Sequence, residues 1–221
     1  MNGTEEITIF TGDRKKQFRN GLKSSKEEAA KLMKLHDIIG TVDVFAIFEE
    51  NNTAYLVMEY LDGCTLAQML KEKKIMPVEE ALKMIRPVIR SLQEIHKNNL
   101  IHRDITPDNI FITKSGELKV LDFGSARCSA LAQNKSISVI VKQGYAPPEQ
   151  YQLYKDQEPW TDVYSLAATI YKMITGKVPE DSITRMVKDT LEAPSALGIT
   201  ITKSQENALL NALNTKINSR T

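Results

Sequence analysis

Three short segments of the sequence carry the side chains with the clearest capacity for chemistry. The first reads HRDITPDN at residues 102–109, the second DFG at 122–124, and the third PPE at 147–149. Carboxylates and the Asn109 side-chain oxygen are hard ligands of the kind that Mg²⁺ prefers, and a carboxylate can also accept a proton. The alternative is a loop Asp, a turn Asn and a hairpin Gly with no common task. We expect instead that Asp104, Asn109 and Asp122 converge around one divalent cation.

In this order and with these gaps, the segments resemble the catalytic loop, the DFG motif and the end of the activation segment of protein kinases. The resemblance covers about residues 27–220, and HRDITPDN, PPEQY and TDVYSLAAT are most similar to bacterial serine/threonine kinases. It implies transfer of the γ-phosphate of ATP to Ser or Thr hydroxyls of a protein substrate. ATP and Mg²⁺ are therefore the expected cofactors.

The resemblance also implies a role for each residue of the catalytic loop. Asp104 is the base, and Asn109 and Asp122 are the metal ligands. Many serine/threonine kinases place a lysine two residues after the base and a threonine opposite it in the activation segment. Here the two residue types are exchanged, as Thr106 and Lys142. We expect Lys142 to bring its ammonium group to the transferring phosphate while Thr106 bonds Asp104; the alternative is a surface lysine and a loop-capping threonine.

Nucleotide contacts are expected from residues outside these motifs. By resemblance, Met58, Glu59 and Leu61 belong to the hinge between two lobes, where the Glu59 carbonyl and the Leu61 amide would bond adenine. Phe111 fits the position beneath the purine ring, or is an ordinary core aromatic. Glu28 resembles the helix glutamate that pairs with the ATP-holding lysine, or is a solvated helical acid.

Supporting contacts are implied as well. Asp162 is expected to anchor the backbone of the HRD segment from below, and Glu149 is expected to meet Arg220 in a structural pair. Arg103 either receives a phosphate from the activation segment or pairs with an acid of the large lobe.

The sequence departs from the family in its N-terminal part. Its ten glycines form no G-x-G-x-x-G motif, and no V-A-I-K strand precedes Glu28. By resemblance, the first three strands of the small lobe and the phosphate-holding lysine are missing. Three explanations stay open: a fragment of a longer kinase, a degenerate gene, or a lobe that another chain completes. Two rival functions also stay open, a pseudokinase-type binding module and a small-molecule phosphotransferase, and the peptide platform GYAPPEQY argues against the second.

The hydrophobic pattern and the resemblance together predict an α+β, protein kinase-like fold with two lobes. Residues 1–60 form a partial small lobe, with one helix from Ser24 and a β-hairpin of strands 42–48 and 53–60. Residues 61–221 form a mainly helical large lobe. Its expected helices include one capped by Thr65, one over 78–97, one over 161–175, and two near 182–192 and 204–214, with short strands around 110–113 and 118–121.

The composition restricts the possible partners. Lys and Arg number 29 against 28 Asp and Glu, so the net charge of +1 offers no bulk attraction to nucleic acid or to an anionic membrane. No apolar run approaches membrane-spanning length, and the first residues lack the order of a secretion signal. Cys64 and Cys128 make no metal-type spacing. We therefore expect a cytoplasmic protein that binds neither nucleic acid nor membrane.

Overall fold

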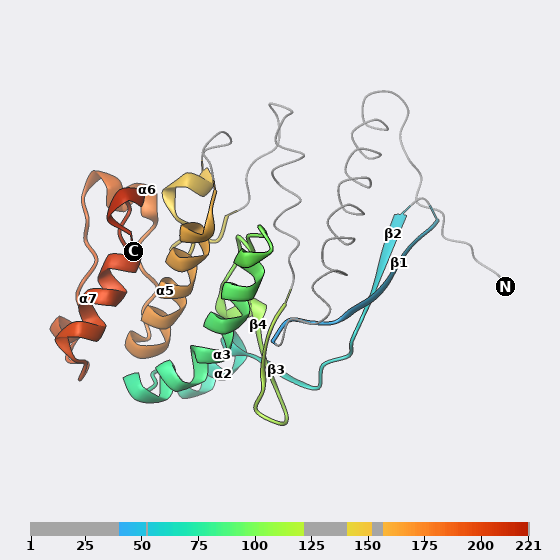
Figure 1. Ribbon diagram of the computed structural model, residues 1–221. Coiled ribbons are helices and arrows are strands. Elements are labelled where there is room, and N and C mark those ends of the chain that lie inside the picture. The colour runs from blue at the N-terminus through green and yellow to red at the C-terminus, as the bar shows by residue number, and fades with distance from the viewer. Residues whose placement is uncertain (1–39, 52, 122–140, 152–156, 221) are drawn as a thin grey trace.

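The computed structural model describes residues 40–51, 53–121, 141–151 and 157–220 (Figure 1). Glu28, Asp122, Cys128 and the helix expected from Ser24 lie outside the described residues. Within these ranges a β-hairpin comes first, and a larger, mainly helical part with a small three-stranded sheet follows. The hairpin lies on the opposite side of the molecule from the helix α7 (Lys203–Ala212) (Figure 1).

The predicted hairpin is present as β1 (Val44–Glu50) and β2 (Thr53–Met58), which pair in antiparallel fashion. Asn51 turns the chain between them with a φ of +51°, a left-handed conformation that asparagine tolerates better than most residues. Phe48 lies opposite Tyr55, and their rings stack with centroids 5.2 Å apart. Both rings are well exposed, so this face of the hairpin is not covered by the described chain.

A second sheet joins the hinge region to the large lobe. It has the order β3–β4–β5, with β3 at Gly63–Thr65, β4 at Ile110–Thr113 and β5 at Leu118–Val120. The sequence predicted β4 and β5 but not β3, which is only three residues long. At its end Thr65 caps α2 (Leu66–Lys73): the Thr65 hydroxyl accepts the Gln68 N–H at 3.2 Å, and the Gln68 side chain accepts the Thr65 N–H at 2.8 Å.

Two long helices form the core of the large lobe, α3 (Val78–Lys97) and α5 (Pro159–Thr175), and they pack against each other (Figure 1). The apolar positions of α3 that the sequence predicted to face inward are all buried: Ala81, Ile85, Val88, Leu92 and Ile95. Pro87 lies inside α3 without ending it. Gly176 ends α5 in a left-handed conformation, with a φ of +72°.

The remaining helices surround this core. They are α6 (Ser182–Val187) and α7 (Lys203–Ala212), with 3₁₀ turns η3 (Pro148–Tyr151), η4 (Pro194–Leu197) and η5 (Ile217–Ser219). The helix near 182–192 is shorter than expected. Asp189 draws the chain out of the helix, because its carboxylate accepts the Leu191 N–H at 3.1 Å and pairs with the buried Arg185 at 2.9 Å. In the part of the chain that is described, no helix combines the length and the apolar character needed to cross a bilayer.

A buried ion pair ties the end of the chain to the large lobe. The Arg220 guanidinium donates to the Glu149 carboxylate, Nη1 to Oε1 at 2.6 Å and Nη2 to Oε2 at 3.3 Å, and both side chains have no exposed surface. Thr161 donates a further bond to Glu149 at 3.2 Å. The predicted structural pair is confirmed.

Replacing Glu149 with alanine should lower the free energy of unfolding by about 3–5 kcal/mol, because Arg220 would be left buried without its counter-charge. Urea unfolding followed by circular dichroism measures the change. The control is Glu94→Ala, which breaks the exposed Glu94–Lys97 pair of 2.7 Å and should cost less than about 1 kcal/mol. Similar losses in the two variants would contradict the prediction.

Candidate active site

The backbone of the segment His102–Asp104 is hydrogen-bonded to a buried carboxylate at the start of α5. Asp162 has no exposed side-chain surface, and it accepts the His102 N–H at 2.9 Å on Oδ2 and the Arg103 N–H at 2.7 Å on Oδ1. The predicted anchor is therefore confirmed. The sequence analysis did not assign a third contact, from His96 Nε2 to Asp162 Oδ2 at 2.8 Å, in which the imidazole donates because an ionised carboxylate only accepts.

Arg103 adopts an unusual backbone conformation within this loop. Its φ is +69°, a left-handed value that costs a residue with a Cβ on the order of 1–3 kcal/mol. The peptide groups on both sides hold it there, since the Arg103 N–H bonds Asp162 and the Arg103 carbonyl accepts from Gln150 Nε2 at 2.5 Å. Gln150, from the motif PPEQ, is thus a supporting residue that the sequence analysis did not identify.

Asp104 and Asn109 are joined through the asparagine amide. Asn109 Nδ2 donates to the Asp104 carbonyl at 2.9 Å and to Asp104 Oδ2 at 2.7 Å. Both partners only accept, so the amide nitrogen must face them, and the Asn109 side-chain oxygen has no hydrogen-bond partner among the described residues. The arrangement therefore combines a fixed carboxylate with a free oxygen ligand.

The end of the neighbouring strand is fixed to the same loop. Leu121 donates its N–H to the Asn109 carbonyl at 2.8 Å, and its own carbonyl lies 2.8 Å from His102 Nε2. Leu121 immediately precedes Asp122, the third predicted member of the site, which is outside the described residues. Within the described ranges no three His, Cys, Asp or Glu side chains gather as a metal site.

Lys142 reaches the catalytic loop from a distant part of the sequence. Its Nζ lies 3.0 Å from the Thr106 hydroxyl and 2.9 Å from Asp108 Oδ2. Thr106 is almost fully buried, and its described side-chain partner is Lys142. The expected bond from Thr106 to Asp104 is therefore absent from the described contacts, whereas Thr106 and Lys142 do face each other as expected.

The backbone around Lys142 forms a tight turn. The Lys142 carbonyl accepts the N–H groups of Tyr145 at 3.1 Å and Ala146 at 3.0 Å. Gly144 has a φ of +80°, and a Cβ there would lie 2.4 Å from the Pro179 carbonyl oxygen, so glycine is required. Burial, and then the negative charge of Asp108, raise the pKa of Tyr145 to about 12, which keeps its hydroxyl protonated at neutral pH.

The hinge segment is held by a side chain for which the sequence predicted only a backbone role. The Glu59 carboxylate forms an ion pair with Lys119 of β5 and accepts the Asp43 N–H at 2.9 Å. Neither the Glu59 carbonyl nor the Leu61 N–H has a hydrogen-bond partner among the described residues, so both can contact a ligand. Met58, the last residue of β2, is well exposed.

Phe111 lies in the sheet that also contains Lys119. It belongs to β4, is partly buried, and lies between Thr65 of β3 and Lys119 of β5 in the register of the sheet. Lys119, the partner of the hinge glutamate, is thus the strand neighbour of Phe111. Glu59 and Phe111 therefore share Lys119 as a neighbour.

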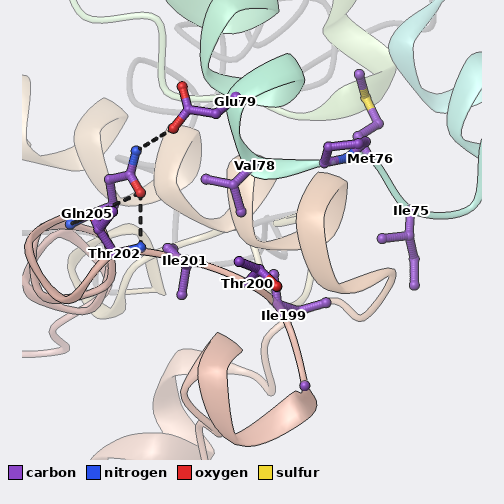
Figure 2. A pocket seen from close by; sticks show the side chains of 11 residues that line it. Ile75, Met76, Val78, Glu79, Ile199, Thr200, Ile201, Thr202 and Gln205 are labelled. Carbon is purple, nitrogen blue, oxygen red and sulfur yellow. Dashed lines mark hydrogen bonds between the residues drawn. The ribbon is translucent and has the colours of Figure 1, made fainter.

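A groove of about 710 Å³ lies away from these residues (Figure 2). One wall is the end of the connection between α2 and α3 with the first residues of α3 (75–79), and the other is the segment before α7 (198–202). At one end Gln205 donates to Glu79 at 2.9 Å, and Ile75 lies at the other end (Figure 2). No residue of the catalytic loop lines the groove, so it is separate from the candidate active site.

The family description "Protein kinase domain" matches residues 9–216 of the sequence. This chain belongs to the protein kinase family. A probable serine/threonine-protein kinase of Clostridium perfringens is 34% identical over 212 residues, which are 90% of this kinase chain and 30% of the relative. Serine/threonine-protein kinase PknA of Mycobacterium tuberculosis is 37% identical over 152 residues, 67% of this chain and 35% of the relative.

A solved structure titled "PpkA-294 apo form" is 32% identical to this kinase chain, with a TM-score of 0.79. The match covers 96% of this chain and 75% of that chain, and it confirms the expected kinase-like α+β fold. The chain spans about a third of the length of the curated kinases that it matches.

In this kinase chain, Asp162→Asn should loosen the catalytic loop. Asparagine retains one acceptor where the carboxylate has two, and each buried donor left unsatisfied costs about 1–3 kcal/mol. Hydrogen exchange at the His102 and Arg103 amides should become faster, whereas the α7 amides serve as an internal control and keep their rates. Unchanged protection of both loop amides would contradict the anchoring role of Asp162.

Proposed function

We propose that this chain is the catalytic part of a serine/threonine protein kinase that transfers the γ-phosphoryl group of ATP to a Ser or Thr hydroxyl of a protein substrate. The observation that carries the proposal is a pair of hydrogen bonds from the Asn109 amide nitrogen to Asp104, at 2.9 and 2.7 Å. These bonds hold the proposed base and the proposed metal ligand together. The family membership of the chain supports the same reaction class.

Asp104 acts as the base. Its Oδ2 is occupied by the Asn109 amide, which fixes the plane of the carboxylate. Its other oxygen has no partner in the described part of the chain, so it is available to orient a substrate hydroxyl and accept its proton. Proton acceptance by a fixed carboxylate requires no further rearrangement of the loop.

Asn109 and Asp122 hold Mg²⁺. The free side-chain oxygen of Asn109 and the carboxylate of Asp122 are the hard donors that this ion prefers, so the donor set fits it. Leu121, the neighbour of Asp122 in the sequence, is hydrogen-bonded to Asn109, which supports a common site. When bound, the ion neutralises charge on the phosphates.

Lys142 provides a cation for the transferring phosphate, and Thr106 orients it. The contact of 3.0 Å between the Lys142 ammonium and the Thr106 hydroxyl supports this exchanged arrangement. Adenine is placed by the hinge residues Met58, Glu59 and Leu61, with Phe111 beneath the ring. Their proximity across β5 is consistent with one purine site.

Residues 1–60 form a partial small lobe and residues 61–221 the large lobe, and further polypeptide completes the small lobe. Glu28 would pair with the lysine that such a segment supplies. The sequence has no glycine-rich motif, and the exposed apolar side chains of the hairpin offer a surface for additional strands. These side chains are Phe45, Phe48, Tyr55, Val57 and Met58.

A binding module without phosphoryl transfer is the second candidate function. The lack of G-x-G-x-x-G in the sequence favours it, because that motif brings backbone amides to the nucleotide. Losing such donors and the lysine slows the reaction by orders of magnitude unless another segment replaces them.

Asp104→Asn separates the two candidates. If the chain is a kinase, this variant should still bind Mg²⁺ and ATP, but transfer to a general acceptor such as casein should fall by about 10²–10⁴-fold, because the base is lost. Differential scanning fluorimetry measures binding, and ³²P incorporation measures transfer. Asn109→Ala is the matched control and should weaken Mg²⁺-dependent binding. Thermal stabilisation by ATP and Mg²⁺ with no transfer by the wild type would favour the binding module.

The exchanged pair can be returned to the more common order. Lys142→Thr alone should slow transfer by roughly 10²–10³-fold, since one phosphate-facing donor is removed. The double variant Thr106→Lys, Lys142→Thr should recover most of that loss, because the cation returns from the opposite side of the same contact. Steady-state kinetics on casein provide the comparison. If the double variant is no faster than Lys142→Thr, positions 106 and 142 have not exchanged roles.

A further inference from the structure

Asp108 carries a carboxylate in the catalytic loop that the proposed mechanism does not use. It lies in η1 (Pro107–Asn109), between Thr106 and the metal ligand Asn109. Its Oδ2 accepts from Lys142 Nζ at 2.9 Å, and its side chain is 63% exposed, against 39% for Lys142. The contact therefore links the loop of the base to the segment after residue 140.

The backbone presents this carboxylate rigidly. Pro107 is buried and fixes the start of the turn, and the Asn109 N–H donates to the Thr106 carbonyl at 2.9 Å. The Asn109 side chain is bonded to Asp104. A shift of the Asp108 backbone would therefore move Asn109, which belongs to the proposed site.

We propose that Asp108 is a positioning residue, whose carboxylate and the nearby Thr106 hydroxyl hold the Lys142 ammonium against the catalytic loop. This inference rests on the proposed function. It concerns how the cation is directed and gives Asp108 no contact with the reacting atoms.

The exchange of residue types explains why such a residue is needed. A lysine at position 106 would start from the catalytic loop itself, whereas Lys142 extends a flexible four-carbon chain from another segment. The Thr106 hydroxyl is a neutral acceptor and attracts an ammonium group only weakly. The ionised Asp108 provides the charge-assisted bond that a directed contact requires.

A role in folding explains the pair less well. Ion pairs between partly exposed side chains contribute little to stability, because water screens them and both side chains lose freedom. Asp108 and Lys142 are both partly exposed, so removing the charge of Asp108 should leave the melting temperature nearly unchanged. A change in nucleotide binding at constant stability is then the signature of positioning.

The first experiment tests the pair without catalysis. The protein is treated with limiting sulfo-N-hydroxysuccinimide acetate, and acetylation of each lysine is quantified by mass spectrometry. Asp108→Asn should accelerate acetylation of Lys142 severalfold and leave Lys114 unchanged. The matched control is Asp62→Asn, which releases Lys114 from a surface pair of 2.7 Å and should affect Lys114 alone. Equal Lys142 rates in the wild type and Asp108→Asn would overturn the proposal.

The second experiment tests what the pair does. Calorimetry with Mg²⁺ gives the affinities for ATP and ADP in the wild type, Asp108→Asn, Asp108→Glu, Lys142→Met and Asp108→Asn/Lys142→Met. Asp108→Asn should reduce the preference for ATP over ADP by roughly 10- to 100-fold, as loss of a supporting partner commonly does. Asp108→Glu should retain most of the preference. The double variant should be no worse than Lys142→Met, because Asp108 acts only through Lys142.

The outcomes separate this inference from the proposed function. A wild-type preference for ATP that Lys142→Met reduces and Asp108→Asn does not would overturn the positioning role alone. Additive losses would overturn it too, since Asp108 would then act directly, for instance on a basic substrate side chain. If the wild type shows no affinity for ATP, the proposed function fails, whereas the acetylation rates still decide whether Asp108 holds Lys142.

Discussion

The buried carboxylate of Asp162 is the contact on which the candidate active site depends. It joins the first turn of α5 to two consecutive backbone N–H groups of the loop, at 2.9 and 2.7 Å, and to His96 of α3. A buried carboxylate is tolerated only when its oxygens are satisfied, and these three donors satisfy it. Because the His102 and Arg103 N–H groups must both point at this carboxylate, Arg103 is held in a left-handed backbone conformation that a residue with a Cβ disfavours. The packing of α3 against α5 thus determines where Asp104 lies.

From that anchor the site is built by short-range contacts inside the loop and by one long-range contact. Asn109 orients Asp104 through two hydrogen bonds of its amide nitrogen, which leaves its side-chain oxygen without a partner among the described residues. The long-range contact comes from Lys142, which lies 36 residues from Thr106 in the sequence. A lysine within the loop would move with the loop, whereas Lys142 contacts Thr106 and Asp108 only when the 142–146 turn lies against the loop. The position of that turn therefore determines whether the loop has this ammonium group as a neighbour.

Sequence patterns predicted the features that periodicity and local chemistry determine. The α3 helix agrees at both ends, because its apolar positions repeat with helical spacing and Pro77 stands before it. The β3 strand was missed because three residues carry no period. The helix α6 is shorter than predicted because Asp189, four residues after Arg185, accepts the Leu191 N–H outside the helix, which periodicity does not indicate. The contacts of Gln150, His96 and Asp108 were missed because their partners are distant in the sequence. The Thr106 hydroxyl was assigned to Asp104, its neighbour in the sequence, but a charged ammonium donor from residue 142 takes it.

The core of the large lobe is built without the hairpin. Its buried core runs from Leu66 to Leu213 and contains no residue of β1 or β2. An isolated two-stranded hairpin is only marginally stable in water, and this one exposes Phe48 and Tyr55 on one face. The hydrogen bonds that hold the catalytic loop to Asp162, and those of the Glu149–Arg220 pair, involve no residue of β1 or β2. The geometry of the loop therefore depends on the packing of the large lobe and on its own short-range contacts.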